Sequence, residues 1–297
     1  MKLALRYALA CSKRIEQTRS SFRGGDDMSQ GSVARSACIA VFCLLFAALN
    51  SSAQAPASNS AFQPVVGQPG KDVVWVPTPQ ATVDKMLEMA KITPQDYLID
   101  LGSGDGRLVI TAAKRGLKAH GIEYNEDMVS LSQRNAATEG VSDRATFAKA
   151  DLFQSDFSRA NVITMFLLPD INLRLRPTIL DMKPGTRIVS NTFTMGDWTP
   201  DETAAVPNCP NYCTALFWIV PAKVSGTWKL SQGELKLTQT YQTFSGTLGN
   251  TTIANGKLAG DLISFEAGGI RYEGKVSGNP IQGTMGTTAR TGFTATR

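Results

Sequence analysis

The sequence predicts an α/β fold with a parallel-rich sheet, followed by a small antiparallel all-β domain. Three observations support this. Helical and strand patterns alternate from residue 76 to about residue 220. A glycine-rich turn, residues 102–106, joins the first strand of that region to a helix. Residues 224–297 hold 13 of the 26 glycines between short alternating runs. With 297 residues, 42% of them hydrophobic, the chain is long enough for about two domains.

The first 55 residues are expected to be a targeting segment. Residues 37–49 (ACIAVFCLLFAAL) form a short apolar run that follows Arg35 and precedes an Ala-x-Ala exit ending at Ala55. This pattern is typical of a secretory signal and predicts an exported protein, periplasmic or secreted, with no stable transmembrane span after cleavage. An uncleaved anchor or an interfacial segment is the alternative, and if the signal is not functional the protein stays cytoplasmic. Met28 would begin a signal of conventional length.

The charge and histidine content exclude several classes of function. The chain carries 30 Lys and Arg against 25 Asp and Glu. Seven of the basic and three of the acidic residues lie in residues 1–55, so the remainder has a net charge of only +1. Nucleic acid is therefore not expected as a partner. The single histidine, His120, cannot build a multi-histidine zinc site, no metal site is predicted, and His120 itself is expected to be a packed sheet residue.

Residues 56–75 are rich in Pro, Ser, Gln and Gly and are predicted to be a flexible lead-in. Residues 76–223 then form the α/β domain. Its elements are predicted in chain order as a helix over 82–91, a strand over 97–101, a helix over 107–116, a strand over 119–124, a helix over 127–140, a strand over 145–150 and a strand over 162–168. Parallel sheets of this kind bind ligands at the carboxyl ends of their strands.

Residues 224–297 are predicted to form an antiparallel domain with strands over 234–241, 243–248, 257–265, 270–276 and 280–285. A faint internal repeat supports a repeated hairpin unit. Phe244, Gly246, Leu248 and Ile253 recur 28 residues later as Tyr272, Gly274, Val276 and Ile281.

The turn Asp100–Gly106 (DLGSGDG) is the most informative stretch. Its three glycines let the backbone turn sharply and approach a ligand closely. The spacing is not that of the dinucleotide fingerprint, and no Gly-Lys-Ser/Thr follows as in a phosphate loop. An aspartate at the end of the strand suits a cationic or amino-bearing ligand better than a pyrophosphate.

Two further carboxylates end the next two strands. Glu123 is placed to accept hydrogen bonds from ribose hydroxyls, and Asp151, followed by Leu152, is placed to receive an adenine amino group. Each carboxylate taken alone could be a solvated residue or a helix cap. Three of them after three successive strands indicate one pocket.

These residues resemble the successive motifs of class I S-adenosylmethionine-dependent methyltransferases, over roughly residues 76–220. More narrowly, Val76-Pro77-Thr78-Pro79, the Gly-Asp-Gly-Arg of the turn, Glu123-Tyr124-Asn125 and Arg187-Ile188-Val189-Ser190-Asn191 resemble the small protein-lysine methyltransferases that act on mitochondrial carrier and ATP-synthase c-subunit proteins. The resemblance implies a Rossmann-like methyltransferase domain with S-adenosylmethionine as cofactor. It implies that the cofactor-binding residues are Thr78, Asp100, Gly102, Ser103, Gly104, Gly106, Glu123, Asp151 and Leu152.

The methyl acceptor is expected at the end of the strand over 162–168. Phe166, Leu167 and Leu168 would shape an apolar channel, and Asp170 or Asn172 could orient an amine as catalytic residues. The three apolar residues could equally be a buried strand ended by proline. The sequence lacks the Asn/Asp-Pro-Pro-Tyr pattern of enzymes that methylate nucleobase amines.

Two further features lie later in the domain. Phe193 and Trp198 could wall the acceptor site or belong to the core. Cys209 and Cys213 are predicted to be a disulfide or two plain thiols rather than a metal-ligand pair.

The leading hypothesis is a methyltransferase that uses S-adenosylmethionine, with a protein lysine as acceptor and the β-domain recruiting the substrate or another partner. Because this cofactor is made in the cytoplasm, an export signal favours one alternative, an exported binding module with a methyltransferase-like domain. The other alternative is methylation of a small molecule or RNA.

Overall fold

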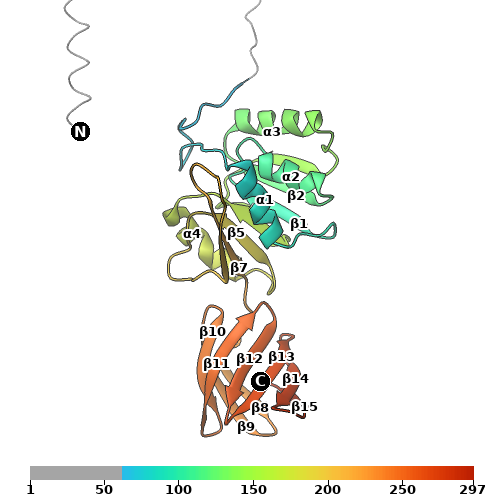
Figure 1. Cartoon of the computed structure of the whole chain (residues 1–297), viewed down its shortest axis with the longest axis vertical. Coiled ribbons are helices and arrows are strands. Elements are labelled where there is room, and N and C mark those ends of the chain that lie inside the picture. Colours follow the sequence, from blue (N-terminus) through green and yellow to red (C-terminus); the bar gives the residue numbers. More distant parts are fainter. Residues whose placement is uncertain (1–61) are drawn as a thin grey trace, which may run out of the picture. The chain divides into compact units, whose positions relative to one another are not determined.

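The computed structural model describes residues 62–297, so the predicted export segment lies outside the described residues (Figure 1). The described part contains two sheets, one of seven strands and one of eight. Helices accompany only the first sheet. Within residues 62–297, no helix is long and apolar enough to span a membrane.

The first sheet has the order β3-β2-β1-β4-β5-β7-β6 and is parallel from β3 to β5, with β7 and β6 antiparallel at one edge. This is the Rossmann-like sheet expected of a methyltransferase. Its strands are β1 (Tyr97–Leu101), β2 (Lys118–Glu123), β3 (Ala145–Lys149), β4 (Val162–Met165), β5 (Arg187–Asn191), β6 (Glu202–Ala205) and β7 (Thr214–Ile219).

The helices cover both faces of this sheet. Buried side chains of α1 (Gln80–Met89), α2 (Arg107–Lys114) and α3 (Glu126–Thr138) share one apolar core with Leu98 of β1. Buried side chains of α4 (Pro169–Leu180) share a second core with Ile99 of the same strand. Alternate residues of β1 therefore enter opposite cores, as the period of a strand requires.

The predicted strand over 162–168 is too long, because β4 ends at Met165. Pro169 is the first residue of α4, and it lacks the N–H that a strand would use for pairing. It also holds Leu168, the residue before it, in an extended conformation (φ −62°, ψ 154°). Residues 166–168 form the short connection between β4 and α4. That helix, together with β6 and β7, was not predicted.

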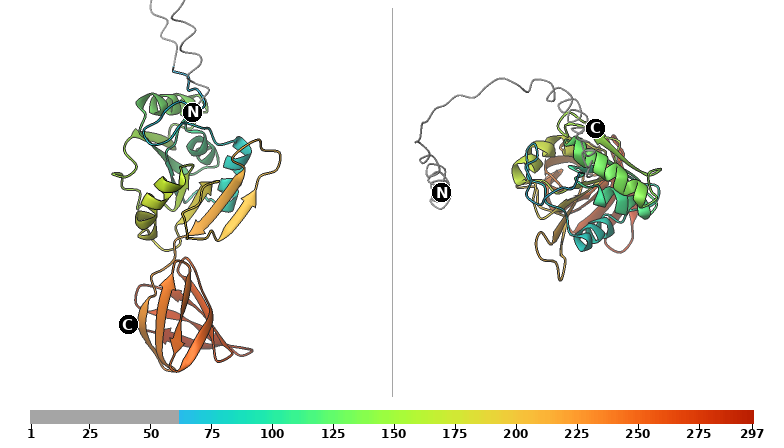
Figure 2. Two further views of the ribbon diagram at one scale, coloured as in Figure 1. Left: turned by 90° about the vertical axis from the view of Figure 1, so that its left-hand side faces the viewer. Right: turned by 90° about the horizontal axis from the view of Figure 1, so that it is seen from above.

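The second sheet runs in chain order from β8 to β15 and is antiparallel throughout. Its strands are β8 (Gly226–Leu230), β9 (Gly233–Thr240), β10 (Thr243–Leu248), β11 (Thr251–Ala259), β12 (Leu262–Ala267), β13 (Ile270–Val276), β14 (Ile281–Gly286) and β15 (Thr291–Ala295). Lys229 and Thr296 pair through two backbone hydrogen bonds of 2.7 and 3.1 Å, which join the two edge strands into a barrel (Figure 2).

The predicted single strand over 257–265 is wrong, because a two-residue turn at Gly260 and Asp261 divides it between β11 and β12. Gly260 adopts φ +64°, a conformation that glycine accepts at little cost. The repeated pattern lies on two hairpins, β10–β11 and β13–β14. Its large apolar members are all buried in the core of the barrel: Phe244, Leu248, Ile253, Tyr272, Val276 and Ile281.

Candidate active site

The carboxyl ends of β1, β2 and β4 surround two adjoining cavities. The larger encloses about 790 Å³, counting the solvent at its mouth, and the smaller about 390 Å³. Gly102, Gly104 and Phe166 line both. Both cavities lie at the edge of the sheet where parallel α/β folds bind their ligands.

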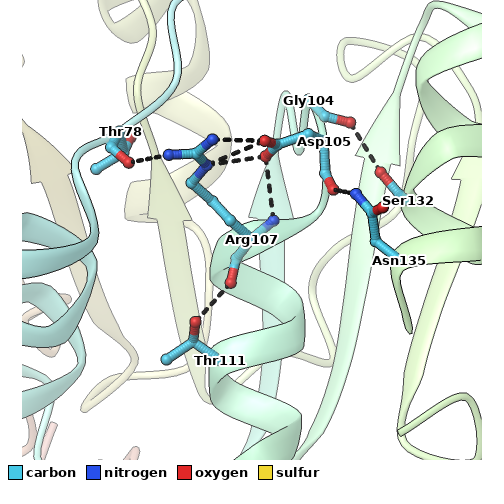
Figure 3. Close-up of polar contacts among 7 residues, drawn as sticks. All are labelled: Thr78, Gly104, Asp105, Arg107, Thr111, Ser132 and Asn135. Carbon is cyan, nitrogen blue, oxygen red and sulfur yellow. Dashed lines mark hydrogen bonds and ion pairs between the residues drawn. The ribbon is translucent and has the colours of Figure 1, made fainter. Parts of the chain in front are cut away.

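The glycine-rich turn is held by Arg107 on one side and by α3 on the other (Figure 3). The Arg107 guanidinium donates to both carboxylate oxygens of Asp105 and to the Thr78 carbonyl at 2.9 Å. From α3, the Ser132 hydroxyl donates to the Gly104 carbonyl at 2.8 Å, and the Asn135 amide donates to the Asp105 carbonyl at 3.0 Å. The turn is therefore shaped in advance by neighbouring elements.

The three glycines of the turn serve different purposes. All three adopt positive φ, between +53° and +81°. A Cβ at Gly102 would approach Leu167 at 3.0 Å and one at Gly104 would approach Trp75 at 2.8 Å, so both keep the cavity walls close together. Gly106 lines neither cavity. It lies against Phe147 and Ser132, where it lets the turn pack closely, and its contact with the cofactor stays a prediction.

Gly106→Ala is expected to lower the free energy of unfolding by roughly 3 kcal/mol, because the new Cβ would be strained by φ +81° and would lie 2.8 to 2.9 Å from Phe147 and Ser132. Gly140→Ala is the matched control, since Gly140 has φ +68° and nothing within 4 Å of its Cβ position. It should cost only about 1 kcal/mol. Urea denaturation measures both, and equal losses would contradict the packing role of Gly106.

Asp100 brings a buried carboxylate to the smaller cavity. It pairs across the sheet with Thr164, whose hydroxyl donates to it at 2.7 Å. Burial raises the pKa of Asp100 to about 7, the Thr164 hydrogen bond opposes the rise, and the charges of Glu123 and Asp105 add to it. An ionised carboxylate in this position is costly without a cation beside it. The smaller cavity is where such a cation would lie.

Glu123 links the second strand to the glycine-rich turn. One carboxylate oxygen accepts from the Gly104 amide and the other from the Asn125 amide, both at 2.9 Å. Each oxygen retains a free lone pair, and the residue lines the larger cavity. The carboxylate is thus oriented by the backbone and able to accept hydrogen bonds from ligand hydroxyl groups.

Asp151 and Leu152 also line the larger cavity, but Asp151 already has a partner. The Lys71 ammonium contacts it at 2.7 Å, and this hydrogen bond holds the pKa of Asp151 below its ordinary value. Lys71 also lies 4.7 Å above the ring of Tyr124. A lysine from the N-terminal side therefore covers the position predicted to receive an adenine amino group.

The segment around Lys71 forms a strap over the larger cavity, defined as residues 68–76. Its composition predicted that most of the strap belongs to a flexible lead-in. In the structure, however, Pro69 bridges to Val74, and Trp75 lies against Gly104. The strap was missed because its partners are distant in sequence: Lys71 contacts Asp151, and Trp75 lies against Gly104. Thr78 follows the strap and lines the smaller cavity.

The predicted acceptor residues separate into two groups. Phe166 lines both cavities and Leu167 lines the larger one, whereas Leu168 is 44% exposed and lines neither. Asp170 is exposed in the first turn of α4. Asn172 is buried, and its amide donates to the carbonyls of Phe193 and Thr194, both at 3.2 Å. Asn172 therefore holds the loop after β5 and lines neither cavity, and its role at the acceptor stays a prediction.

Phe193 lies in that loop and stacks on Phe166 with ring centroids 5.8 Å apart. Tyr212, which the sequence did not single out, reaches the same place, 5.1 Å from Phe166. It lies between Cys209 and Cys213, which are joined by a disulfide. Trp198 is completely buried in the core beneath α4 and takes no part in this cluster.

The site fits S-adenosylmethionine on the chemistry of its own groups. The buried Asp100 carboxylate lacks a cationic partner among the described residues, and the cofactor carries a sulfonium and an amino group. The buried Ser103 hydroxyl on the smaller cavity has no hydrogen-bond partner within residues 62–297. Glu123 offers acceptors where a sugar would lie.

Comparison with known proteins agrees with this chemistry. The family model of the ANTKMT methyltransferase domain matches residues 100–202. The protein-lysine N-methyltransferase of Saccharolobus islandicus is 44% identical over 151 residues, which cover 50% of this chain and 94% of that protein. The human lysine N-methyltransferase named for the ATP synthase c-subunit is 34% identical over 129 residues, and the matched part spans 55% of its length.

Among solved structures, an RNA methyltransferase from Salinibacter ruber in complex with S-adenosyl-L-homocysteine is 43% identical. The match covers 50% of this chain and 96% of that chain, with a TM-score of 0.48. The coverage of the Saccharolobus protein and the identity to it establish the relationship. The chain is an S-adenosylmethionine-dependent methyltransferase and belongs to the family represented by the protein-lysine N-methyltransferase of Saccharolobus islandicus.

Proposed function

We propose that this enzyme methylates the ε-amino group of lysine residues in another protein. The observation that carries the proposal is the position of Phe166. This residue lines both cavities and also contacts the ring of Tyr212 outside them. The names of the Saccharolobus and human relatives support a lysine acceptor.

When bound, S-adenosylmethionine supplies an electrophilic methyl group on a sulfonium. The Asp100 carboxylate would bind the cationic methionine end, Glu123 the ribose, and Asp151 the adenine amino group after displacement of Lys71. The glycine-rich turn would accept the methionine moiety and sugar through Gly102 and Gly104. The chain's share of the catalysis is to position these groups and to keep water from the reacting atoms.

A lysine acceptor must lose a proton before it can attack, because its ordinary pKa is about 10.4. An apolar environment disfavours the ammonium form. Phe166, Leu167 and Met165 provide such an environment at the end of β4. Asp170, which is exposed at the start of α4 and lines neither cavity, is proposed to accept the released proton.

The proposal is tested by incubating the full chain with methyl-labelled cofactor and a lysate of the source organism, followed by hydrolysis of the labelled fraction. We expect label in protein, recovered as ε-N-methyl-lysine. Label recovered in RNA or in small molecules would overturn the lysine acceptor and favour the corresponding alternative. No transfer, together with cofactor binding, would favour a binding module.

We further propose that residues 76–223 perform the transfer and that the barrel, residues 224–297, recruits the acceptor protein. None of the residues lining either cavity comes from the barrel. A chain of residues 56–223 should bind the cofactor as the full chain does, but should methylate the labelled protein more slowly than the full chain does. Loss of cofactor binding on truncation would place the domain boundary elsewhere.

Export by the segment over residues 1–55 also stays a proposal. The Cys209–Cys213 disulfide supports it, because disulfides persist in oxidising compartments. Fractionation of cells producing the full chain would test it. Recovery of the whole protein from the cytoplasm with residues 1–55 attached would contradict export.

A further inference from the structure

An aromatic surface leads outward from the cofactor cavities. Phe166 lines both cavities and is partly buried, as is Phe193, while Tyr212 is 40% exposed. The ring centroids are 5.8 Å apart for Phe166 and Phe193, 5.1 Å for Phe166 and Tyr212, and 6.2 Å for Phe193 and Tyr212. The three rings form one continuous cluster, which we call the aromatic wall.

The outermost ring is held in place by a covalent clip. The Cys209–Cys213 disulfide closes the short loop that carries Tyr212, and the Tyr212 backbone adopts φ +57°, which is unfavourable for a residue with a Cβ. The same loop is tied to α1, since the buried Thr82 hydroxyl donates to the Tyr212 carbonyl at 3.4 Å. The loop thus keeps a strained residue in one orientation, toward Phe166.

We propose that the aromatic wall binds the side chain of the acceptor lysine and that the disulfide keeps Tyr212 in this wall as a positioning residue. The inference rests on the proposed lysine acceptor and names the residues that would receive it. A lysine combines an apolar four-carbon stem with a cationic end, and aromatic faces contact both favourably.

The exposure of the rings separates this role from ordinary packing. Trp198, from the same stretch of chain as Phe193, is completely buried, as expected for a core residue. Tyr212 instead places a large ring at the surface, beside Phe166. Methylation of the amine leaves a cation whose charge is more diffuse, so the wall would also hold lysines already bearing one or two methyl groups.

The disulfide makes this part of the site sensitive to reduction. Breaking the Cys209–Cys213 bond frees the loop from its closure, and the strained φ of Tyr212 can then relax. The cofactor residues lie on other elements, at the ends of β1, β2 and β3. Reduction should therefore weaken acceptor binding and leave cofactor binding unchanged.

The wall is tested on the full chain saturated with S-adenosyl-L-homocysteine. This complex is titrated with N-acetyl-ε-trimethyllysine methylamide as the cationic probe, and NMR records the ring proton signals of the aromatic residues. The neutral norleucine analogue is the matched probe. We expect the signals of Phe166, Phe193 and Tyr212 to shift, and the cationic probe to bind roughly 3- to 30-fold more tightly than the neutral one.

Three variants separate the parts of the proposal. Tyr212→Phe should keep the preference for the cationic probe, whereas Tyr212→Leu should lose most of it because the leucine has no aromatic face. The double variant Cys209→Ser and Cys213→Ser should behave like Tyr212→Leu, as should the wild type after reduction. Unchanged affinity for S-adenosyl-L-homocysteine confirms that each variant is folded.

Binding of the probe without shifts in these rings, or equal affinity for the two probes, would overturn the wall. An intact preference in the double cysteine variant would overturn the role of the disulfide alone. Failure of the proposed function has a different signature. In that case the labelling experiment yields no methyl-lysine, whatever the probes do.

Discussion

Replacing Asp100 with asparagine is expected to stabilise the fold and to weaken cofactor binding at the same time. Asparagine keeps the shape of the side chain and can still accept the hydrogen bond from Thr164, but it carries no charge. Loss of a charged hydrogen bond to the cofactor should cost about 1.5 to 3 kcal/mol, or roughly 10- to 150-fold in affinity at pH 8. Isothermal titration calorimetry with S-adenosylmethionine measures this loss.

The gain in stability follows from the direction of the pKa shift. The folded protein holds the pKa of Asp100 at about 7, whereas the ordinary value is 3.8. Between these two pH values the folded chain binds a proton that the unfolded chain does not, so the stability contributed by this group falls as pH rises from about 4 to 7. Asp100→Asn should remove that fall and raise the free energy of unfolding at pH 8 by up to about 4 kcal/mol.

Cofactor binding should depend on the same proton. Because a cationic ligand requires the ionised carboxylate, wild-type affinity should decrease below pH 7, by at most about tenfold per pH unit. The Asp100→Asn variant is the control, since its affinity should lack this dependence between pH 5.5 and 7. A wild-type affinity that does not change across this range would refute the role of Asp100 as the partner of the cofactor's cationic end.

Glu123→Ala should weaken cofactor binding by about 1 to 3 kcal/mol, or roughly 5- to 150-fold. The variant removes the proposed acceptor for the ribose, and it also leaves the amides of Gly104 and Asn125 without their partner. The same calorimetric titration measures the affinity. Thermal unfolding should also show a moderate loss of stability, because the glycine-rich turn loses its tie to β2.

Glu126→Ala provides the matched control for Glu123. Glu126 lies three residues later, and its side chain is 73% exposed and pairs with exposed Lys149. Exposed ion pairs of this kind contribute little, so its removal should leave both affinity and stability nearly unchanged. Equal effects of the two substitutions would show that Glu123 does not act through its position in the site.

The part of the site that local sequence pattern could predict lies between β1 and β3. Residues close together in the sequence are enough to recognise the apolar strands, the helix periodicity and the glycines at 102, 104 and 106. Parallel strands place their carboxyl ends at one edge, so the approximate convergence of Asp100, Glu123 and Asp151 follows from the strand order alone. Eight of the nine predicted cofactor-binding residues line at least one of the two cavities, and their roles there stay predictions.

The parts that were missed depend on contacts between distant residues. The strap is closed by Lys71 on Asp151, 80 residues away, and its Pro- and Gly-rich composition indicates only the absence of regular structure. Tyr212 reaches Phe166 because a disulfide loop and a strained backbone redirect the chain. Neither contact leaves a periodic signal in the sequence.

Asn172 illustrates a different limit of the sequence pattern. Its residue type and position after β4 indicated a polar group at the acceptor, but helix geometry turns it inward, where its amide binds the carbonyls of the loop carrying Phe193. The direction of a side chain at the start of a helix depends on where the helix begins. Here α4 begins at Pro169, three residues after Phe166, the first residue of the predicted channel.

The central claim is that the carboxyl edge of the first sheet binds S-adenosylmethionine through Asp100 and Glu123. The most direct measurement is a calorimetric titration of the full chain with S-adenosylmethionine at pH 8, repeated with the two variants. We predict one cofactor per chain and much weaker binding in Asp100→Asn and in Glu123→Ala. Absence of heat at millimolar cofactor, or wild-type affinity in both variants, would contradict the claim.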